Sequence, residues 1–182
     1  MINVNDTYSI TIAGVKRELK KYPVNENLDI AAFILFGDVE VTVASAKELL
    51  KKVPEFDVIL TPEAKSIPLA YEMSRQSQKP YVVVRKGVKV YMSDPVSVSV
   101  KSITTDNVQT LYIGAEDSEK IVGKRVLVVD DVISTGESLS AVLQLVEKVG
   151  GKVAASCAVL AEGDAADRDD IKFLEPLPLF FK

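Results

Sequence analysis

The sequence predicts an α/β fold whose core is a doubly wound, mainly parallel sheet flanked by helices. From residue 57 onward, the strand-like runs are continuously apolar rather than alternating, which is typical of strands buried on both faces. Segments with helical periodicity separate these runs, as they do when helices connect parallel strands. At 182 residues with 47% hydrophobic content, the chain is expected to form a single domain over residues 1–182.

The core is predicted to span about residues 53–161, with one further strand beyond it. Strands are expected over residues 57–61, 80–85, 125–130 and 152–161, and a fifth over 171–177. One helix is expected over 66–79. A second, over 137–149, places Leu139, Val142, Leu143 and Val146 on one face, and Gly150 and Gly151 end it.

Two regions depart from this alternation. Residues 88–103 and 107–114 show period-2 patterning, which predicts a β-hairpin insertion with Asp106 and Asn107 near its turn. The N-terminal region, about residues 1–52, looks strand-like over 7–14, 30–37 and 39–44, before a helix over 45–53. We expect this region to supply an edge strand and a cap over the sheet.

Composition excludes several classes of chemistry. The chain has no histidine and one cysteine, Cys157, so it has no internal disulfide, no Ser-His or Cys-His catalytic pair and no Cys/His zinc site. The charge sum of 22 − 26 = −4 argues against a nucleic-acid partner. The sequence shows no secretory signal and no apolar run of about 20 residues. We therefore expect a cytoplasmic protein that does not associate with membranes.

The segment VLVVDDVISTGES, residues 126–138, carries the chemistry. Asp130 and Asp131 follow a buried strand, and a hydroxyl-rich loop with Gly136 then leads directly into a helix. Open α/β sheets bind ligands at the carboxyl ends of their strands, and a helix N-terminus offers N–H groups to an anion. Carboxylates beside a phosphate would repel it unless they face sugar hydroxyls or Mg²⁺. The pattern therefore predicts a sugar-phosphate site.

A structural alternative exists for part of this segment. Ser134 and Glu137 fit the S-x-x-E capping box, which would start the helix without any ligand. That box does not account for two consecutive acids after a buried strand, since charges there must be solvated or paired. The P-loop and the dinucleotide fingerprint are both absent, which disfavours NTPase and dehydrogenase functions.

At these residues the sequence resembles the type I phosphoribosyltransferases, whose 13-residue motif binds phosphoribosyl pyrophosphate (PRPP). The resemblance implies that Asp130 and Asp131 hold the ribose hydroxyls. It also implies that the 5′-phosphate is wrapped by the seven residues that follow: Val132, Ile133, Ser134, Thr135, Gly136, Glu137 and Ser138. Glu137 stands where the family often has glycine.

The family's other substrate loops have counterparts in this chain. The pyrophosphate loop corresponds to Glu63, Ala64, Lys65 and Ser66, which resembles the Glu-x-Arg-Gly loop of adenine phosphoribosyltransferases with Lys for Arg and Ser for Gly. Such loops often contain a cis non-proline bond. Arg85, Lys86 and Lys89 resemble the start of the mobile catalytic loop that meets pyrophosphate. The resemblance implies catalytic roles for Lys86, Arg85 and Asp131, with Lys65 as a further leaving-group contact.

The resemblance further implies a purine phosphoribosyltransferase of purine salvage that uses PRPP, a purine base and Mg²⁺ and forms a homodimer. No direct protein ligand to the metal is expected; substrate and water would hold it near Asp130 and Asp131. Ser134 favours adenine, because many 6-oxopurine enzymes of the family have Asp there. A small hood over the base would come from the chain ends, with Phe33, Phe36 and residues 162–182 as candidates. The alternatives are a hypoxanthine-, guanine- or xanthine-specific enzyme and a PRPP- or nucleotide-sensing regulator without catalysis.

Overall fold

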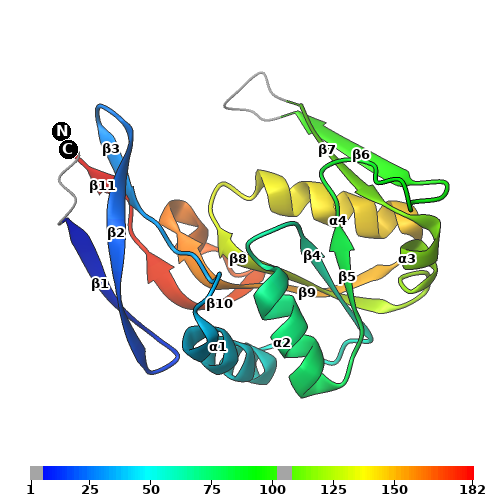
Figure 1. The fold of residues 1–182 in the computed structure, drawn as a ribbon, viewed down its shortest axis with the longest axis horizontal. Helices are drawn as coiled ribbons and strands as arrows, with labels where there is room; N and C mark the ends of the chain where they lie inside the picture. The colour runs from blue at the N-terminus through cyan, green and yellow to red at the C-terminus, as the bar shows by residue number, and fades with distance from the viewer. Residues whose placement is uncertain (1–5, 102–107) are drawn as a thin grey trace.

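A five-stranded parallel sheet forms the centre of the computed structural model, which describes residues 6–101 and 108–182. Its strand order is β10-β9-β8-β4-β5, and every neighbouring pair is parallel. The predicted doubly wound sheet is therefore confirmed, including the fifth strand (Figure 1). The strands are β4 (Val58–Pro62), β5 (Tyr81–Val84), β8 (Arg125–Ile133), β9 (Lys152–Glu162) and β10 (Ile171–Leu177).

Helices cover both faces of this sheet (Figure 1). α1 (Val39–Lys52) and α2 (Ile67–Ser77) lie on one face, and α4 (Glu137–Val149) lies on the other. Of the apolar stripe expected for the last helix, Leu139, Val142 and Val146 are buried and Leu143 is partly buried. Ala141 and Leu145, which the stripe did not include, are buried as well. Because each face of the sheet packs on an apolar helix surface, the continuous apolar strands are explained.

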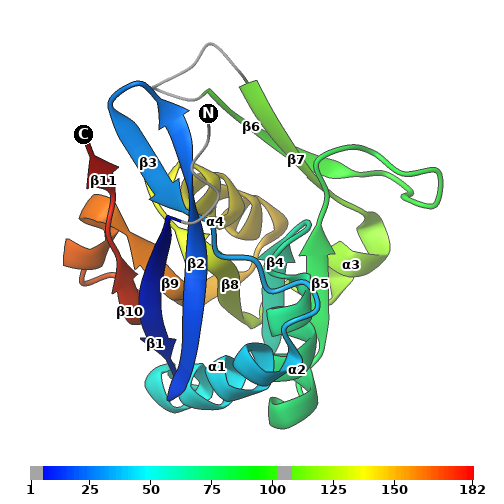
Figure 2. The same cartoon turned by 60° about the vertical axis from the view of Figure 1, so that its left-hand side comes forward.

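The two chain ends form a second, antiparallel sheet with the order β1-β2-β3-β11 (Figure 2). We call it the end sheet; it consists of β1 (Thr7–Ile12), β2 (Val15–Asn25), β3 (Leu28–Ala31) and β11 (Phe180–Phe181). Both chain ends, from which the hood is expected to come, therefore meet in one sheet. The expected edge strand is wrong, because the edges of the central sheet are β10 and β5, which both lie after residue 57.

The strand-like reading of residues 30–37 and 39–44 is also wrong. Only Ile30 and Ala31 belong to a strand, and α1 already begins at Val39. The side chain of Asp38 caps this helix by accepting a hydrogen bond from Val41 N at 3.2 Å. Burial follows helical spacing, with Val41, Ser45, Ala46 and Leu49 against the core. The sequence VEVTV alternates apolar and polar residues as a strand does, which explains the wrong prediction.

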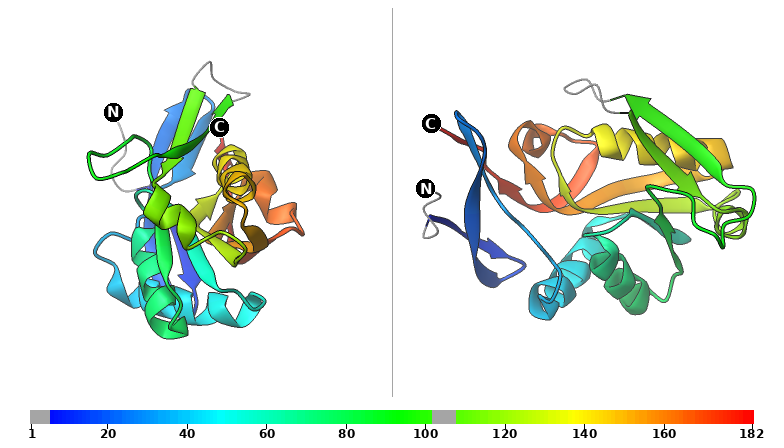
Figure 3. Two further views of the ribbon diagram at one scale, coloured as in Figure 1. Left: turned by 90° about the vertical axis from the view of Figure 1, so that its right-hand side faces the viewer. Right: turned by 45° about the horizontal axis from the view of Figure 1, so that its top comes forward.

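The predicted hairpin insertion is present as β6 (Val96–Lys101) and β7 (Val108–Ile113), which pair antiparallel. Its predicted turn at Asp106 and Asn107 lies outside the described residues. Reciprocal backbone hydrogen bonds of 2.9 and 2.8 Å between Arg85 and Tyr112 join the hairpin to the end of β5. The short helix α3 (Ala115–Glu119) follows, and the hairpin lies at the opposite end of the molecule from the end sheet (Figure 3).

The strand order places a reversal of winding between β4 and β8. From β4 the chain crosses to β5 on one side, whereas from β8 it crosses to β9 on the other. Such a switch point opens a crevice at the carboxyl ends of the strands. β8 pairs with β4 only as far as Val128, yet it continues to Ile133 along β9. The expected strand end at Asp130 is therefore wrong by three residues, and both acids lie beyond the last residue of β8 that pairs with β4.

Candidate functional site

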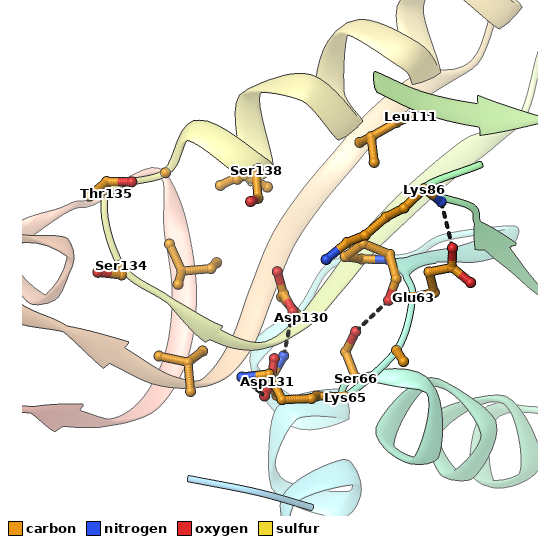
Figure 4. Close-up of a pocket in the computed structure, with 16 residues that line it drawn as sticks. Glu63, Lys65, Ser66, Lys86, Leu111, Asp130, Asp131, Ser134, Thr135 and Ser138 are labelled. Carbon is orange, nitrogen blue, oxygen red and sulfur yellow. Dashed lines mark hydrogen bonds and ion pairs between the residues drawn. The ribbon is translucent and has the colours of Figure 1, made fainter. Parts of the chain in front are cut away.

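A cavity of about 290 Å³ lies at the carboxyl ends of β4 and β8 (Figure 4). Two chain segments supply most of its wall: the loop between β4 and α2, and the path from the end of β8 into α4. Its described lining residues are Pro62, Glu63, Ala64, Lys65, Ser66, Lys86, Leu111, Asp130, Asp131, Val132, Ile133, Ser134, Thr135, Gly136, Ser138 and Leu139. The residues predicted to bind a sugar phosphate therefore lie at the switch point between β4 and β8.

Asp130 and Asp131 point to different parts of this cavity, because successive residues of a strand face opposite ways (Figure 4). Asp131 is buried, and its Oδ2 lies 3.2 Å from Lys65 Nζ. The Asp131 N–H donates to Asp130 Oδ1 at 2.9 Å. Burial, followed by the neighbouring Asp131 carboxyl, raises the pKa of Asp130 to about 8. Two neighbouring carboxylates are thus unfavourable here, and binding of one proton or one cation would stabilise the pair.

The loop after β8 leads into α4 without a side-chain cap. Gly136 is the N-cap residue at φ +82°, and among the described residues no side chain makes a capping hydrogen bond there. The helix begins at Glu137, so Ser134 and Glu137 do not hold the positions that a capping box requires. The capping-box alternative is therefore wrong. An N-terminus of this kind has N–H groups that can bind an anion.

Hydrogen bonds of two hydroxyl groups anchor the loop after β4. Ser66 Oγ donates to Pro62 O at 2.9 Å and accepts from Thr61 Oγ1 at 2.7 Å. Ser66 is buried and lines the cavity, and these two hydrogen bonds fix its hydroxyl within the loop. The Glu63–Ala64 peptide bond is cis, as the resemblance implied.

Glu63 connects this loop to the strand end that carries the basic residues. Its Oε1 accepts a hydrogen bond from Lys86 N at 2.6 Å, and its Oε2 lies 3.2 Å from Arg85 Nε. The side chain of Lys86 extends into the cavity toward Asp130 (Figure 4). The structure therefore brings Lys65 and Lys86 together with the two acids.

Other expected site residues lie outside the lining. Arg85 contacts the lining through its ion pair with Glu63, and Glu137 is not among the described lining residues. Lys89 is also outside it, and its N–H donates to Met92 Sδ at 3.4 Å. Of the aromatic hood candidates, Phe33 is buried in the core and Phe36 is 55% exposed, and neither reaches the cavity.

Three residues that lie at or beside the site were not predicted from the sequence. Leu111 of β7 and Leu139 of α4 contribute apolar wall. The period-2 pattern of the hairpin could have placed Leu111 on the same inward face as Ile113, since both are fully buried. The third, Arg168, lies against Gly136 from outside the cavity, and no sequence signal pointed to it.

Comparison with known proteins decides the family. The model of the phosphoribosyl transferase domain matches residues 40–177, which is most of the chain. The chain belongs to the phosphoribosyltransferase family. The resemblance to its type I purine branch is thereby confirmed.

The curated relatives of this phosphoribosyltransferase carry more than one name. It is 31% identical over 140 residues to an adenine phosphoribosyltransferase of Kosmotoga olearia, which covers 77% of this chain and 74% of that protein. It is 32% identical over 152 residues to HGPRTase-like protein 1 of Halalkalicoccus jeotgali, covering 84% and 77%. It is also 34% identical over 113 residues to the purine biosynthesis transcriptional repressor PurR of Bacillus subtilis, covering 62% and 39%.

The fold is also similar to that of a solved structure. The crystal structure of an adenine phosphoribosyltransferase from Thermoanaerobacter pseudethanolicus superposes with a TM-score of 0.72 at 22% identity, covering 87% of this phosphoribosyltransferase and 95% of that chain.

None of the helices in the described part of the chain is both long and apolar enough to cross a bilayer.

Proposed function

We propose that the chain transfers the 5-phosphoribosyl group from PRPP to a purine base, adenine in preference, to give a nucleoside monophosphate and pyrophosphate in purine salvage. One observation carries this proposal: the acid pair of β8 leads directly into the uncapped start of α4, with Lys65 and Lys86 across the same cavity. Carboxylates for a sugar, N–H groups for a phosphate and cations for a leaving group thus surround one cavity.

Each part of PRPP has a matching part of the cavity. Residues 132–138, with the first turn of α4, receive the 5′-phosphate, and Asp130 and Asp131 accept from the ribose hydroxyls. The pyrophosphate lies between the Glu63–Ser66 loop and Lys86, with Arg85 and Lys89 approaching from the strand end after β5. Ser66 lines this end and holds its loop through a hydrogen bond to Pro62 O, whereas Arg85 supports it through Glu63.

The reaction asks this chain to position reactants and to stabilise charge. The family's transition state resembles an oxocarbenium ion with a departing pyrophosphate, so no nucleophilic side chain is needed. Lys65 and Lys86 stabilise the negative charge that grows on the leaving group, because a low-dielectric cavity strengthens preorganised cations. The absence of histidine is compatible with this chemistry.

The acid pair also fits a magnesium ion held mainly by substrate and water. Asp131 Oδ2 is buried and, among the described residues, accepts no hydrogen bond of good geometry. With the raised pKa of Asp130, this marks a place where a cation would be favourable. Mg²⁺ bound with PRPP would neutralise the pyrophosphate oxygens. Asp130 and Asp131 would hold its water ligands and the ribose hydroxyls.

Adenine is the proposed base because Ser134 is small and neutral at the position where many 6-oxopurine enzymes have Asp. Relatives named for adenine, at 31% and 37% identity, and relatives named for hypoxanthine and guanine, at 36% and 28%, are about equally similar to the chain. The choice among bases therefore rests on Ser134 and on the wall formed by Leu111, Val132 and Ile133.

A second function, PRPP sensing without catalysis, is favoured by the PurR relative. Lys65, Ser66 and Glu137 depart from the enzyme pattern, and a Glu137 carboxylate inside the phosphate end would have favoured sensing. Glu137 is not a described lining residue of the cavity. The site therefore supports catalysis better.

We further propose a cytoplasmic homodimer. The exposed side chains of Val39, Val43 and Tyr71 share one apolar patch between the start of α1 and α2, and Ile34 and Phe36, just before α1, are exposed too. Patches of this kind often mark protein interfaces. Sedimentation of the wild type and of a Val39→Glu variant tests the dimer: a dimeric wild type and a monomeric variant support it, and a monomeric wild type overturns it.

The primary test measures pyrophosphate release from PRPP and Mg²⁺ with adenine, hypoxanthine, guanine or xanthine. Release with adenine above the other bases supports the full proposal, and release with another base corrects only the specificity. Calorimetric binding of PRPP without release for any base supports the sensor. A folded protein that neither binds PRPP nor releases pyrophosphate overturns both functions.

A further inference from the structure

The guanidinium of Arg168 lies directly against Gly136, the residue at which the loop after β8 becomes α4. A Cβ atom at Gly136 would overlap Nη1 of Arg168. Glycine is favoured at position 136 by its φ of +82°, and the absence of a Cβ lets the guanidinium approach this closely. The contact joins residues 32 positions apart.

Arg168 is oriented by a neighbour in sequence. Its Nε and Nη2 donate to the two carboxylate oxygens of Asp170 at 2.8 and 2.6 Å. This fork-to-fork pair fixes the plane of the guanidinium and directs the remaining nitrogen, Nη1, at the loop. Arg168 is thus a preorganised cation that Asp170 aims at Gly136.

The backbone that carries Arg168 is also anchored beside the loop. Arg168 follows the 3₁₀ turn η1 (Gly163–Asp167) at the end of β9, which pairs with β8. Ala165 of this turn is buried in one apolar cluster with Ile133 and Leu139, the residues just before and just after the loop. Movement of the turn would therefore disturb both ends of the loop.

The distribution of charge in the cavity suggests what the contact between Arg168 and Gly136 does. The described cationic residues in the lining, Lys65 and Lys86, belong to the proposed pyrophosphate end. At the opposite end, Ser134, Thr135, Gly136 and Ser138 offer only neutral donors. A 5′-phosphate there would lie near the carboxylates of β8, so a cation behind the loop would offset their repulsion.

We propose that Arg168 is a positioning residue for the phosphate-binding loop: it holds the backbone at Gly136 in place and adds positive charge behind the 5′-phosphate. The inference rests on the proposed function, because it takes residues 132–138 to be the phosphate end. Arg168 does not line the cavity, so it acts through the loop. Its loss should weaken binding at the phosphate end and leave the pyrophosphate end unchanged.

The test compares Arg168→Met and Arg168→Lys with wild type, using ribose 5-phosphate and pyrophosphate as separate calorimetric probes. We expect Arg168→Met to weaken ribose 5-phosphate binding and to raise KM for PRPP by about tenfold, with kcat and pyrophosphate affinity within about twofold. Arg168→Lys should recover part of the affinity, because it keeps the charge but not the fork. Asp170→Asn should fall between wild type and Arg168→Met.

Arg125→Met is the matched control. Arg125 pairs with Asp57 through the same two nitrogens, at 3.1 and 2.8 Å, but it lies at the other end of β8. Equal effects of Arg168→Met and Arg125→Met on ribose 5-phosphate binding overturn the inference, as does an equal loss of pyrophosphate affinity. If the folded wild type binds neither PRPP nor ribose 5-phosphate, the proposed function fails, and the inference fails with it.

Discussion

Lys65 Nζ lies 3.2 Å from Asp131 Oδ2, which joins the loop after β4 to the acid pair of β8 across the switch point. The lysine side chain is 54% exposed, whereas that of the aspartate is only 6% exposed. The pair thus links a solvated cation to a buried anion. The proposed substrate would compete for both, since pyrophosphate attracts Lys65 and the ribose hydroxyls donate to Asp131.

Replacing Lys65 with Ala should weaken pyrophosphate binding by about tenfold, because one charged contact is removed. Lys65→Arg should preserve binding, because the guanidinium keeps the charge and adds a fork. Calorimetry with pyrophosphate measures both. Lys51→Ala, which removes another exposed lysine that pairs with a carboxylate, is the control. Pyrophosphate affinity that is the same in Lys65→Ala and Lys51→Ala would remove Lys65 from the site.

Asp131→Asn should lower kcat/KM for PRPP between about tenfold and a hundredfold, the range for a hydrogen bond to a charged group. The amide has nearly the same shape, so the fold should persist. Steady-state kinetics and circular dichroism measure the two effects. Wild-type kinetics in a folded Asp131→Asn protein would contradict the assignment of the ribose subsite.

Glu63→Ala should reduce kcat because Glu63 is the link between the pyrophosphate loop and Lys86. The variant loses both the 2.6 Å hydrogen bond from Lys86 N and the ion pair with Arg85. We expect kcat to fall about tenfold, with ribose 5-phosphate affinity unchanged. Glu63→Gln keeps an oxygen acceptor for Lys86 N, so it should retain more activity. Glu40→Gln, at a carboxylate paired with Arg17 near the end sheet, controls for a general charge effect. Activity equal to wild type in Glu63→Ala would show that this link is dispensable.

Ser134→Asp should move base preference toward hypoxanthine and guanine. A carboxylate at this position can accept a hydrogen bond from the protonated N7 of a 6-oxopurine. The ratio of kcat/KM for hypoxanthine to that for adenine should rise about tenfold, the equivalent of one net hydrogen bond. Thr135→Asp in the same loop is the control for added charge near the phosphate. An unchanged ratio in an active Ser134→Asp enzyme would show that other walls choose the base.

Features that depend on neighbouring residues could be predicted from the sequence, and features that depend on contacts between distant segments could not. The buried strands and α4 were predictable because apolar runs and helical spacing are local properties. The start of α1 was missed because VEVTV alternates like a strand, whereas the Asp38 cap and burial of Val41, Ala46 and Leu49 favour a helix. The extension of β8 to Ile133 depends on pairing with β9, which no local pattern reports.

The same distinction applies to the site. The acid pair and the loop after it form one continuous motif, so the sequence could predict them together. The contacts of Lys65 with Asp131 and of Arg168 with Gly136 join residues 66 and 32 positions apart. Such contacts follow from strand order and from the turn after β9, so only the folded chain reveals them.

The raised pKa of Asp130 predicts that the free protein loses stability as pH rises. Between its ordinary value of 3.8 and about 8, Asp130 holds a proton in the folded state that it has lost in the unfolded state. More bound protons in the folded state mean that the free energy of unfolding falls with rising pH across this window. Asp131 strengthens the effect and Lys65 opposes it.

Asp130→Asn should remove this dependence, because the amide resembles the protonated acid. Urea unfolding at several pH values between 4 and 8 measures the difference between variant and wild type. At pH 4 the two should be nearly equal, and by pH 8 the variant should be more stable by at least about 1.4 kcal/mol, the equivalent of one pKa unit. Asp164→Asn, at an exposed carboxyl in η1, should leave the pH profile unchanged. If the gap between Asp130→Asn and wild type stays constant from pH 4 to pH 8, Asp130 is ionised throughout, and the acid pair does not share a proton in the free protein.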